Sequence, residues 1–317
     1  MLFSESRFAD FSERIHPMTV KELRQGLRAR KFVIPFISIH IVMVAACALE
    51  YFIVTDMAKG SRTFAGADDN LIRYGLIYWS VAYFMMLFVI PATRFFDLQQ
   101  EFSGRNAELL LLSGLSRWQI VRGKWVFSVA LSILVFVSIL PYLFLRYFFG
   151  GFELVEHLLI GAALLLNNAV FCAMVIGASA YRNYLGRVSL ILAAVFVLGS
   201  TMIPVTIGAV VTIERPGFWG GFASLFLFIN LITAGAFFTI LGLQLARVKL
   251  RTFEDPYDPA PGSQVVILYL FAPLLIVITG IFIPNVGSIL AALFFTWIAI
   301  NIDPPPKKGK RAFYAQH

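Results

Sequence analysis

The sequence predicts an all-α protein, a polytopic bundle of about eight transmembrane helices, and three observations carry this prediction. Hydrophobic residues make up 59% of the 317 positions and charged residues only 14%, whereas soluble domains carry about 25% charged residues. The apolar residues gather in runs of about 17–25 residues, the length that crosses a bilayer as a helix. Lysines and arginines flank these runs, so the net charge of +8 indicates membrane topology rather than nucleic-acid binding.

The chain divides into three regions. Residues 1–31 form a polar, basic N-terminal segment that lacks the apolar core of a signal peptide. Residues 32–302 form the transmembrane domain, and residues 303–317 form a basic tail. Only residues 284–287 separate the last two apolar runs, so a helical hairpin that enters the membrane and returns is an alternative to two full spans. The expected spans are 32–54, 74–92, 125–149, 158–180, 188–212, 221–246, 264–283 and 287–302.

The distribution of basic residues orients these spans. Most lysines and arginines fall before the first span, within 93–124, 181–187 and 247–251, and in the tail. The positive-inside rule therefore predicts that both termini are cytoplasmic, in a plasma membrane of the bacterial inner-membrane type. The few basic residues left for the other side are Lys59, Arg62, Arg73, Arg146 and Arg215.

A short amphipathic helix is expected before the first span. Thr19 and Glu22 have the spacing of a capping box, and the apolar and basic residues of 17–31 fall on different faces. We expect this helix to lie on the inner membrane surface against lipid headgroups. A solvated basic anchor would satisfy the same charge rule and is the alternative. The charged residues of the helix are Lys21, Glu22, Arg24 and Arg28.

The segment 93–124 is expected to be more than a loop. Its charged residues recur every three or four positions, which predicts that the second span continues into the cytoplasm as a helix with one charged face. That helix should stop at the Ser113-Gly114 break, and Ser116 with Gln119 forms a capping box for the next helix. The charged positions are Arg94, Asp97, Glu101, Arg105 and Glu108.

This segment carries a family resemblance. Its sequence ELLLLSGLSRWQIVRGK resembles the cytoplasmic coupling region of type-2 ATP-binding cassette (ABC) exporter permeases, which commonly read like LELLLLTPLSRWEIVLGK between their second and third spans. The N-terminal HPMTVKELRQGLRARKF resembles the basic interfacial helix that opens such permeases. These permeases usually have six spans rather than eight, and Gly114 stands where they often have proline.

The resemblance implies that the coupling segment 93–124 docks a separate ATP-binding subunit and that the chain pairs with a second permease subunit, identical or different. The alternative is that the leucines simply lie on the membrane surface or on other parts of this chain. The residues expected to dock the ATPase are Arg105, Glu108, Leu111, Leu112, Ser113, Gly114, Ser116 and Arg117.

Motifs for chemistry on this chain are missing. No GxxxxGK[ST] loop is present, so ATP and Mg²⁺ are expected on the partner and no cofactor on this chain. There is also no HExxH and no GxSxG motif, and the four histidines have no ligand spacing, so we expect no metal site and no catalytic residues. The two cysteines, Cys47 and Cys172, lie in apolar runs.

A few polar residues lie inside the expected spans, where ionisable groups are functional candidates. Glu50 and Arg146 share a similar outer depth, which favours either an ion pair or separate snorkelling to the interface. His40 is a candidate site or a hydrogen-bonded packing residue. Asn167 and Asn168 are candidate sites or hydrogen-bonding contacts between helices.

A small-residue stripe is expected to pack closely against another helix. It consists of Ala169, Ala173 and Gly177. Prolines inside spans, at positions 141, 204 and 273, predict kinks.

The sequence as a whole predicts the membrane subunit of an ATP-driven ABC exporter, a non-catalytic chain that contacts membrane lipids. An ATP-independent carrier or channel, and a membrane scaffold that anchors a partner, are the alternatives. The substrate cannot be deduced from these residues.

Overall fold

The protein is helical, and no strand occurs among the residues described by the computed structural model: Gly26, 30–58, 75–96, 98–99, 117–149, 154–181, 183–207, 218–254, 262–283 and 286–302. In chain order the helices are α3 (Arg30–Ala58), α5 (Leu76–Phe84), η2 (Met85–Val89), α6 (Ile90–Ala92), α9 (Arg117–Phe149), α10 (Leu154–Ser179), α11 (Tyr184–Val197), η3 (Leu198–Met202), α13 (Phe218–Glu254), α14 (Gly262–Phe282) and α15 (Gly287–Ile302).

Six of the described helices are long and apolar enough to cross a membrane, which makes the chain a multi-pass membrane protein. Eight full-length spans are not confirmed among the described residues. Two of the expected spans form shorter apolar helices, Ile77–Ala92 and Gly287–Ile302. A helix of 16 residues is about 24 Å long, less than the hydrocarbon core of about 30 Å.

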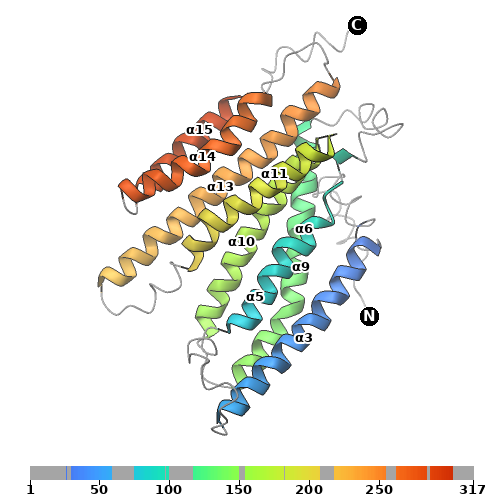
Figure 1. Ribbon diagram of the computed structural model, residues 1–317, viewed down its shortest axis with the longest axis vertical. Helices are drawn as coiled ribbons and strands as arrows, with labels where there is room; N and C mark the ends of the chain where they lie inside the picture. Colours follow the sequence, from blue (N-terminus) through green and yellow to red (C-terminus); the bar gives the residue numbers. More distant parts are fainter. Residues whose placement is uncertain are drawn as a thin grey trace, which may run out of the picture.

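Successive helices run in alternating directions and lie side by side in one bundle (Figure 1). The helices α3, α9, α11 and α14 begin at one end, and α6, α10, α13 and α15 finish there. Most of the described arginines and lysines lie at that end, which we call the basic end. Helices α14 and α15 run in opposite directions and pack against each other and against α13.

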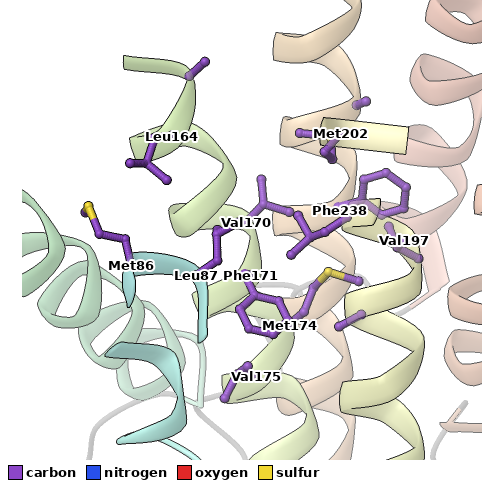
Figure 2. Close-up of a cluster of buried hydrophobic side chains, with 14 of the residues drawn as sticks. Met86, Leu87, Leu164, Val170, Phe171, Met174, Val175, Val197, Met202 and Phe238 are labelled. Atoms are coloured by element: carbon purple, nitrogen blue, oxygen red, sulfur yellow. The ribbon is translucent and has the colours of Figure 1, made fainter. Parts of the chain in front are cut away.

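Helix α10 occupies the centre of the bundle. Of its most apolar window 72% is buried, against 22–44% for the other five candidate spans. Figure 2 shows the reason: Met86 and Leu87 of η2 approach α10 from one side, while Met202 of η3 and Phe238 of α13 approach it from the other. The outward faces of the surrounding helices carry exposed isoleucine, leucine and phenylalanine side chains, as expected for surfaces in contact with lipid.

The two π-helical segments, η2 and η3, share one local cause. Each precedes a proline at the same spacing, Pro91 after η2 and Pro204 after η3. A proline has no N–H for the carbonyl four residues earlier, and its ring crowds that carbonyl. The carbonyls concerned belong to Leu87 and Ser200, the central residue of each π segment, and a wider turn relieves the crowding.

The expected continuous helix beyond the second span is interrupted by turns at residues 93–96, and Leu98 and Gln99 are helical again. Helix α6 finishes at Ala92, and the chain continues as tight turns in which Arg94 N donates to Pro91 O at 2.9 Å and Phe95 N to Ala92 O at 3.2 Å. Thr93 also donates its hydroxyl to Ile90 O at 2.6 Å, and such local bonds compete with the helix. Arg94 therefore lies in a turn and not on a continuous helical stripe.

Candidate functional site

Most of the expected docking residues lie outside the described residues: Arg105, Glu108, Leu111, Leu112, Ser113, Gly114 and Ser116. The same holds for Lys21, Glu22, Arg24 and Arg28 of the expected interfacial helix. Arg117 is described and lies in α9, whereas the expected cap at Ser116 lies outside the described residues. Gly26 is described too, and the ring of Phe127 on α9 fills the space where a side chain at position 26 would project.

The residues on either side of 100–116 are anchored in one apolar cluster at the basic end. Leu98 is fully buried on the leading side, and Ile120 and Val121 are buried on the trailing side. We call this set the basic-end cluster; it joins α9, α10 and α13. Its members are Leu98, Ile120, Val121, Ala173, Ile176, Ala180, Leu243, Ala246 and Leu250, with Trp118 and Trp125 packed against it.

Cation–aromatic contacts surround this cluster. The guanidinium carbon of Arg94 lies 4.4 Å from the ring centroid of Phe127. The Trp118 ring lies between Arg122 at 6.0 Å and Arg247 at 5.9 Å. Such contacts are stronger where water is excluded, so they fix the first turns of α9 against the last turns of α13.

Tyr181, in the turn between α10 and α11, belongs to the same end. The Lys249 ammonium lies 5.0 Å from its ring centroid. Burial raises the pKa of Tyr181 to about 12, because a buried site disfavours the phenolate. The ring therefore stays neutral at physiological pH and presents its face to the cation.

Arg187, at the start of α11, is a residue that the sequence analysis did not single out. Its side chain is only 1% exposed. Its guanidinium donates to Tyr181 O and to Gln99 Oε1. The only sequence signal was a basic residue at the start of an apolar run, which the positive-inside rule explains equally well.

At the opposite end of the bundle, Glu50 and Arg146 form an ion pair, with Arg146 Nε 2.7 Å from Glu50 Oε2. The snorkelling alternative is wrong for Arg146, which is only 4% exposed. The other carboxylate oxygen, Glu50 Oε1, accepts a hydrogen bond from Tyr78 N at 2.8 Å. Tyr78 is in the first turn of α5, so the carboxylate also meets the positive end of that helix.

The backbone leading into α5 is shaped around this ion pair. Gly75 adopts φ 57°, a left-handed conformation that glycine tolerates best. A side chain at this position would overlap the guanidinium of Arg146. The pair therefore joins α3, the start of α5 and α9.

The remaining intramembrane candidates are all hydrogen-bonded between helices. His40 Nδ1 and the Tyr142 hydroxyl are 3.1 Å apart. Asn167 donates to Thr206 Oγ1 at 3.1 Å, and Asn168 donates to Met86 O in the η2 turn. The structure thus places the two asparagines between the two π-helical segments and pairs them with opposite sides of the core.

The small-residue stripe lies against α13. The space beyond Gly177 is filled by backbone atoms of Gly242, and the space beyond Gly242 by backbone atoms of Ala173 and Met174. Ala169 contributes its carbonyl, which accepts a hydrogen bond from Trp125 Nε1 at 2.9 Å. Gly242 was not singled out from the sequence, although Ala246 lies four residues after it.

Within the described residues no group of three or more His, Cys, Asp or Glu side chains is arranged to hold a metal ion. Protein-family models, curated proteins and solved structures were compared with the chain, and none of them matches it.

Proposed function

We propose that this chain is the transmembrane subunit of an ATP-driven ABC exporter. A separate ATP-binding subunit would dock on the coupling segment 93–124 and carry the ATP and Mg²⁺. Two permease halves, identical or different, would form the complete pump, and this chain itself does no chemistry. The substrate is left open.

The observation that carries the proposal is the continuity between the leucine-rich segment and α9. Helix α9 begins at Arg117, directly after that segment, and continues for 33 residues to Phe149. Such a helix is about 50 Å long, well beyond the membrane core of about 30 Å. Force applied at its first turn would tilt the helix as a body, which is the mechanical requirement for ATP-driven transport.

A second long helix supports the same reading. Helix α13 has 37 residues, about 55 Å, and its end contacts the beginning of α9 through the Arg247–Trp118 pair. The two helices meet at the basic end. By the positive-inside rule that end would be cytoplasmic, which puts both termini and the ATPase on the same side of a bacterial inner membrane.

We also propose that the chain passes the membrane eight times in spite of its two short helices. The helices α3 and α9 run in the same direction, so the segment that includes α5, η2 and α6 must bring the chain back between them. It does so in the bundle interior, where Tyr78, Trp79 and Met86 are buried. The local bilayer can thin around α15 at modest cost.

The experiment is an affinity purification in mild detergent with mass spectrometry of the associated proteins. A near-stoichiometric soluble protein with a P-loop should accompany the wild-type chain. The Glu108→Lys/Arg117→Glu variant should lose it, because both charges flank the leucine segment. Its matched control is Asp68→Lys/Arg62→Glu, which makes the same exchange in the loop expected on the other side.

Three results would count against the proposal. If no ATPase accompanies the wild-type chain in several detergents, an ATP-independent carrier or channel becomes the better account, to be tested by flux in liposomes. If the ATPase is retained by the Glu108/Arg117 variant, the docking surface is misplaced. If the ATPase binds but its hydrolysis drives no flux, the chain is a scaffold.

A further inference from the structure

We propose that Arg187 is the positioning residue that transmits movement of the coupling segment to α10 and α11. The inference rests on the proposed function, since it concerns how a docked ATPase would reach the bundle. It starts from one side chain: Arg187 donates to Gln99, which lies 88 residues earlier in the chain, and to Tyr181 O in the turn between α10 and α11.

The guanidinium uses both its edge and its faces. Along the edge, Nε donates to Tyr181 O at 3.3 Å, and Nη2 donates to the same carbonyl at 2.7 Å and also to Gln99 Oε1. Its carbon lies 5.2 Å from the Phe95 ring centroid and 5.0 Å from that of Phe96. A planar guanidinium can donate and stack at the same time, which an ammonium cannot do.

Helix stability does not explain this residue. Arg187 lies in the first turns of α11, after the Asn183 cap, where a cation opposes the helix dipole. It is buried, and among the described residues no carboxylate pairs with it. A buried cation is costly unless its contacts compensate. The contacts that compensate here are those to Tyr181 O, Gln99, Phe95 and Phe96.

The contact lies where the coupling segment leaves the bundle. Leu98, next to Gln99, is a member of the basic-end cluster, and Phe95 also lies against Tyr184, with ring centroids 6.2 Å apart. Leu98 packs against α9, α10 and α13. Gln99 is hydrogen-bonded to Arg187 of α11, so a displacement of 93–99 would move both α10 and α11.

The first test uses the purified chain alone, by hydrogen exchange. Arg187→Met keeps the length and apolar surface of the side chain but removes its donors, and Gln99→Leu removes the acceptor on the coupling side only. Each should speed exchange in peptides covering 93–99 and 180–186 by about tenfold, the effect of losing a charged hydrogen bond. Arg187→Lys should give a smaller increase, and peptides from α14 and α15 should not change.

The second test uses the copurified complex, with spin labels on cysteines at Phe52 and Ile207 in a background where Cys47 and Cys172 are alanine. Both label positions are exposed at the end opposite the basic end. ATP with vanadate should shift the distance between the labels in the wild type. Arg187→Met should retain the ATPase but lose the shift. Arg30→Gln removes one exposed charge at the basic end and should keep the shift.

The outcomes separate this inference from the proposed function. Unchanged hydrogen exchange in Arg187→Met would overturn the contact, and a full ATP-dependent shift in that variant would overturn transmission through it. If the wild-type chain brings no ATPase, transmission falls with the proposed function, whereas faster exchange would still establish the contact. Loss of the shift in Arg30→Gln as well would show that charge at this end, and not Arg187, is responsible.

Discussion

Substituting alanine for Gly242 should force the two central helices apart. A Cβ atom at this position would lie 2.7 Å from the carbonyl carbon and oxygen of Ala173 and 2.8 Å from the nitrogen of Met174. All three are backbone atoms, so no side chain can rotate out of the way. Ordinary contacts begin at 3.4 Å, and α10 and α13 must therefore separate by roughly 0.7 Å, at an overpacking cost of about 1–3 kcal/mol.

Helix propensity acts in the other direction, because alanine is favoured over glycine in a helix by about 1 kcal/mol. Gly235 on the same helix provides the control. Alanine there would meet only side-chain atoms, at 3.5 Å or more, so Gly235→Ala should be neutral or stabilising. Both variants gain the same propensity, so the difference between their unfolding free energies reports the steric cost alone.

The assay is equilibrium unfolding of the purified protein in mixed micelles with increasing sodium dodecyl sulfate. Gly242→Ala should be less stable than Gly235→Ala by about 1–3 kcal/mol. Adding Gly177→Ala should cost less than the sum of the single changes, because one separation of the helices relieves both contacts. Equal stability of the two single variants would show that α10 and α13 do not approach each other as closely as the structure has them.

Three further predictions use the same unfolding assay. Arg146→Met should destabilise the protein by about 3–5 kcal/mol, because it leaves the Glu50 carboxylate unpaired. The double variant with Glu50→Leu should recover part of this loss. A double variant less stable than either single variant would contradict the pairing. Gly75→Ala should cost about 1–2 kcal/mol for its left-handed backbone. The cost should be smaller in an Arg146→Met background, where no guanidinium occupies the space that the new Cβ enters. No loss of stability would show that this turn is not constrained. Asn168→Leu should cost about 1 kcal/mol, because a carbonyl in the η2 turn loses its donor. Asn301→Leu should cost less, because the exposed Asn301 side chain donates within its own helix. Equal effects of the two substitutions would refute a role of Asn168 between helices.

Features that depend on one stretch of chain were predictable from the sequence. The apolar runs locate the six candidate spans because the bilayer fixes the length of a spanning helix. The similar depth of Glu50 and Arg146 allowed the ion pair that the structure shows, but it did not decide between that pair and snorkelling. The stripe ending at Gly177 predicted a close contact with another helix but did not identify that helix.

Features that depend on contacts between distant segments were not predictable. The stripe did not identify Gly242, because α13 carries several glycines and spacing alone does not show which of them faces α10. Arg187 looked like any basic residue at a membrane boundary, and only folding brings it to Gln99. Turns at 93–96 interrupt the expected continuous helix because Pro91 and Thr93 favour local bonds over the charged periodicity. The periodicity of the charged residues reports only their spacing and does not show whether local backbone hydrogen bonds compete with the helix.

The most direct test of the central claim is site-specific photo-cross-linking in intact cells. A photoreactive amino acid at Leu112 lies in the leucine segment that we expect to dock the ATPase, and the same group at Ile283 lies in the α14–α15 turn, away from the basic end. Mass spectrometry of the products should identify a P-loop protein cross-linked at position 112 and not at position 283. Only lipid or self-cross-links at position 112, or the same protein captured equally at both positions, would contradict the claim that this chain is driven by a docked ATPase.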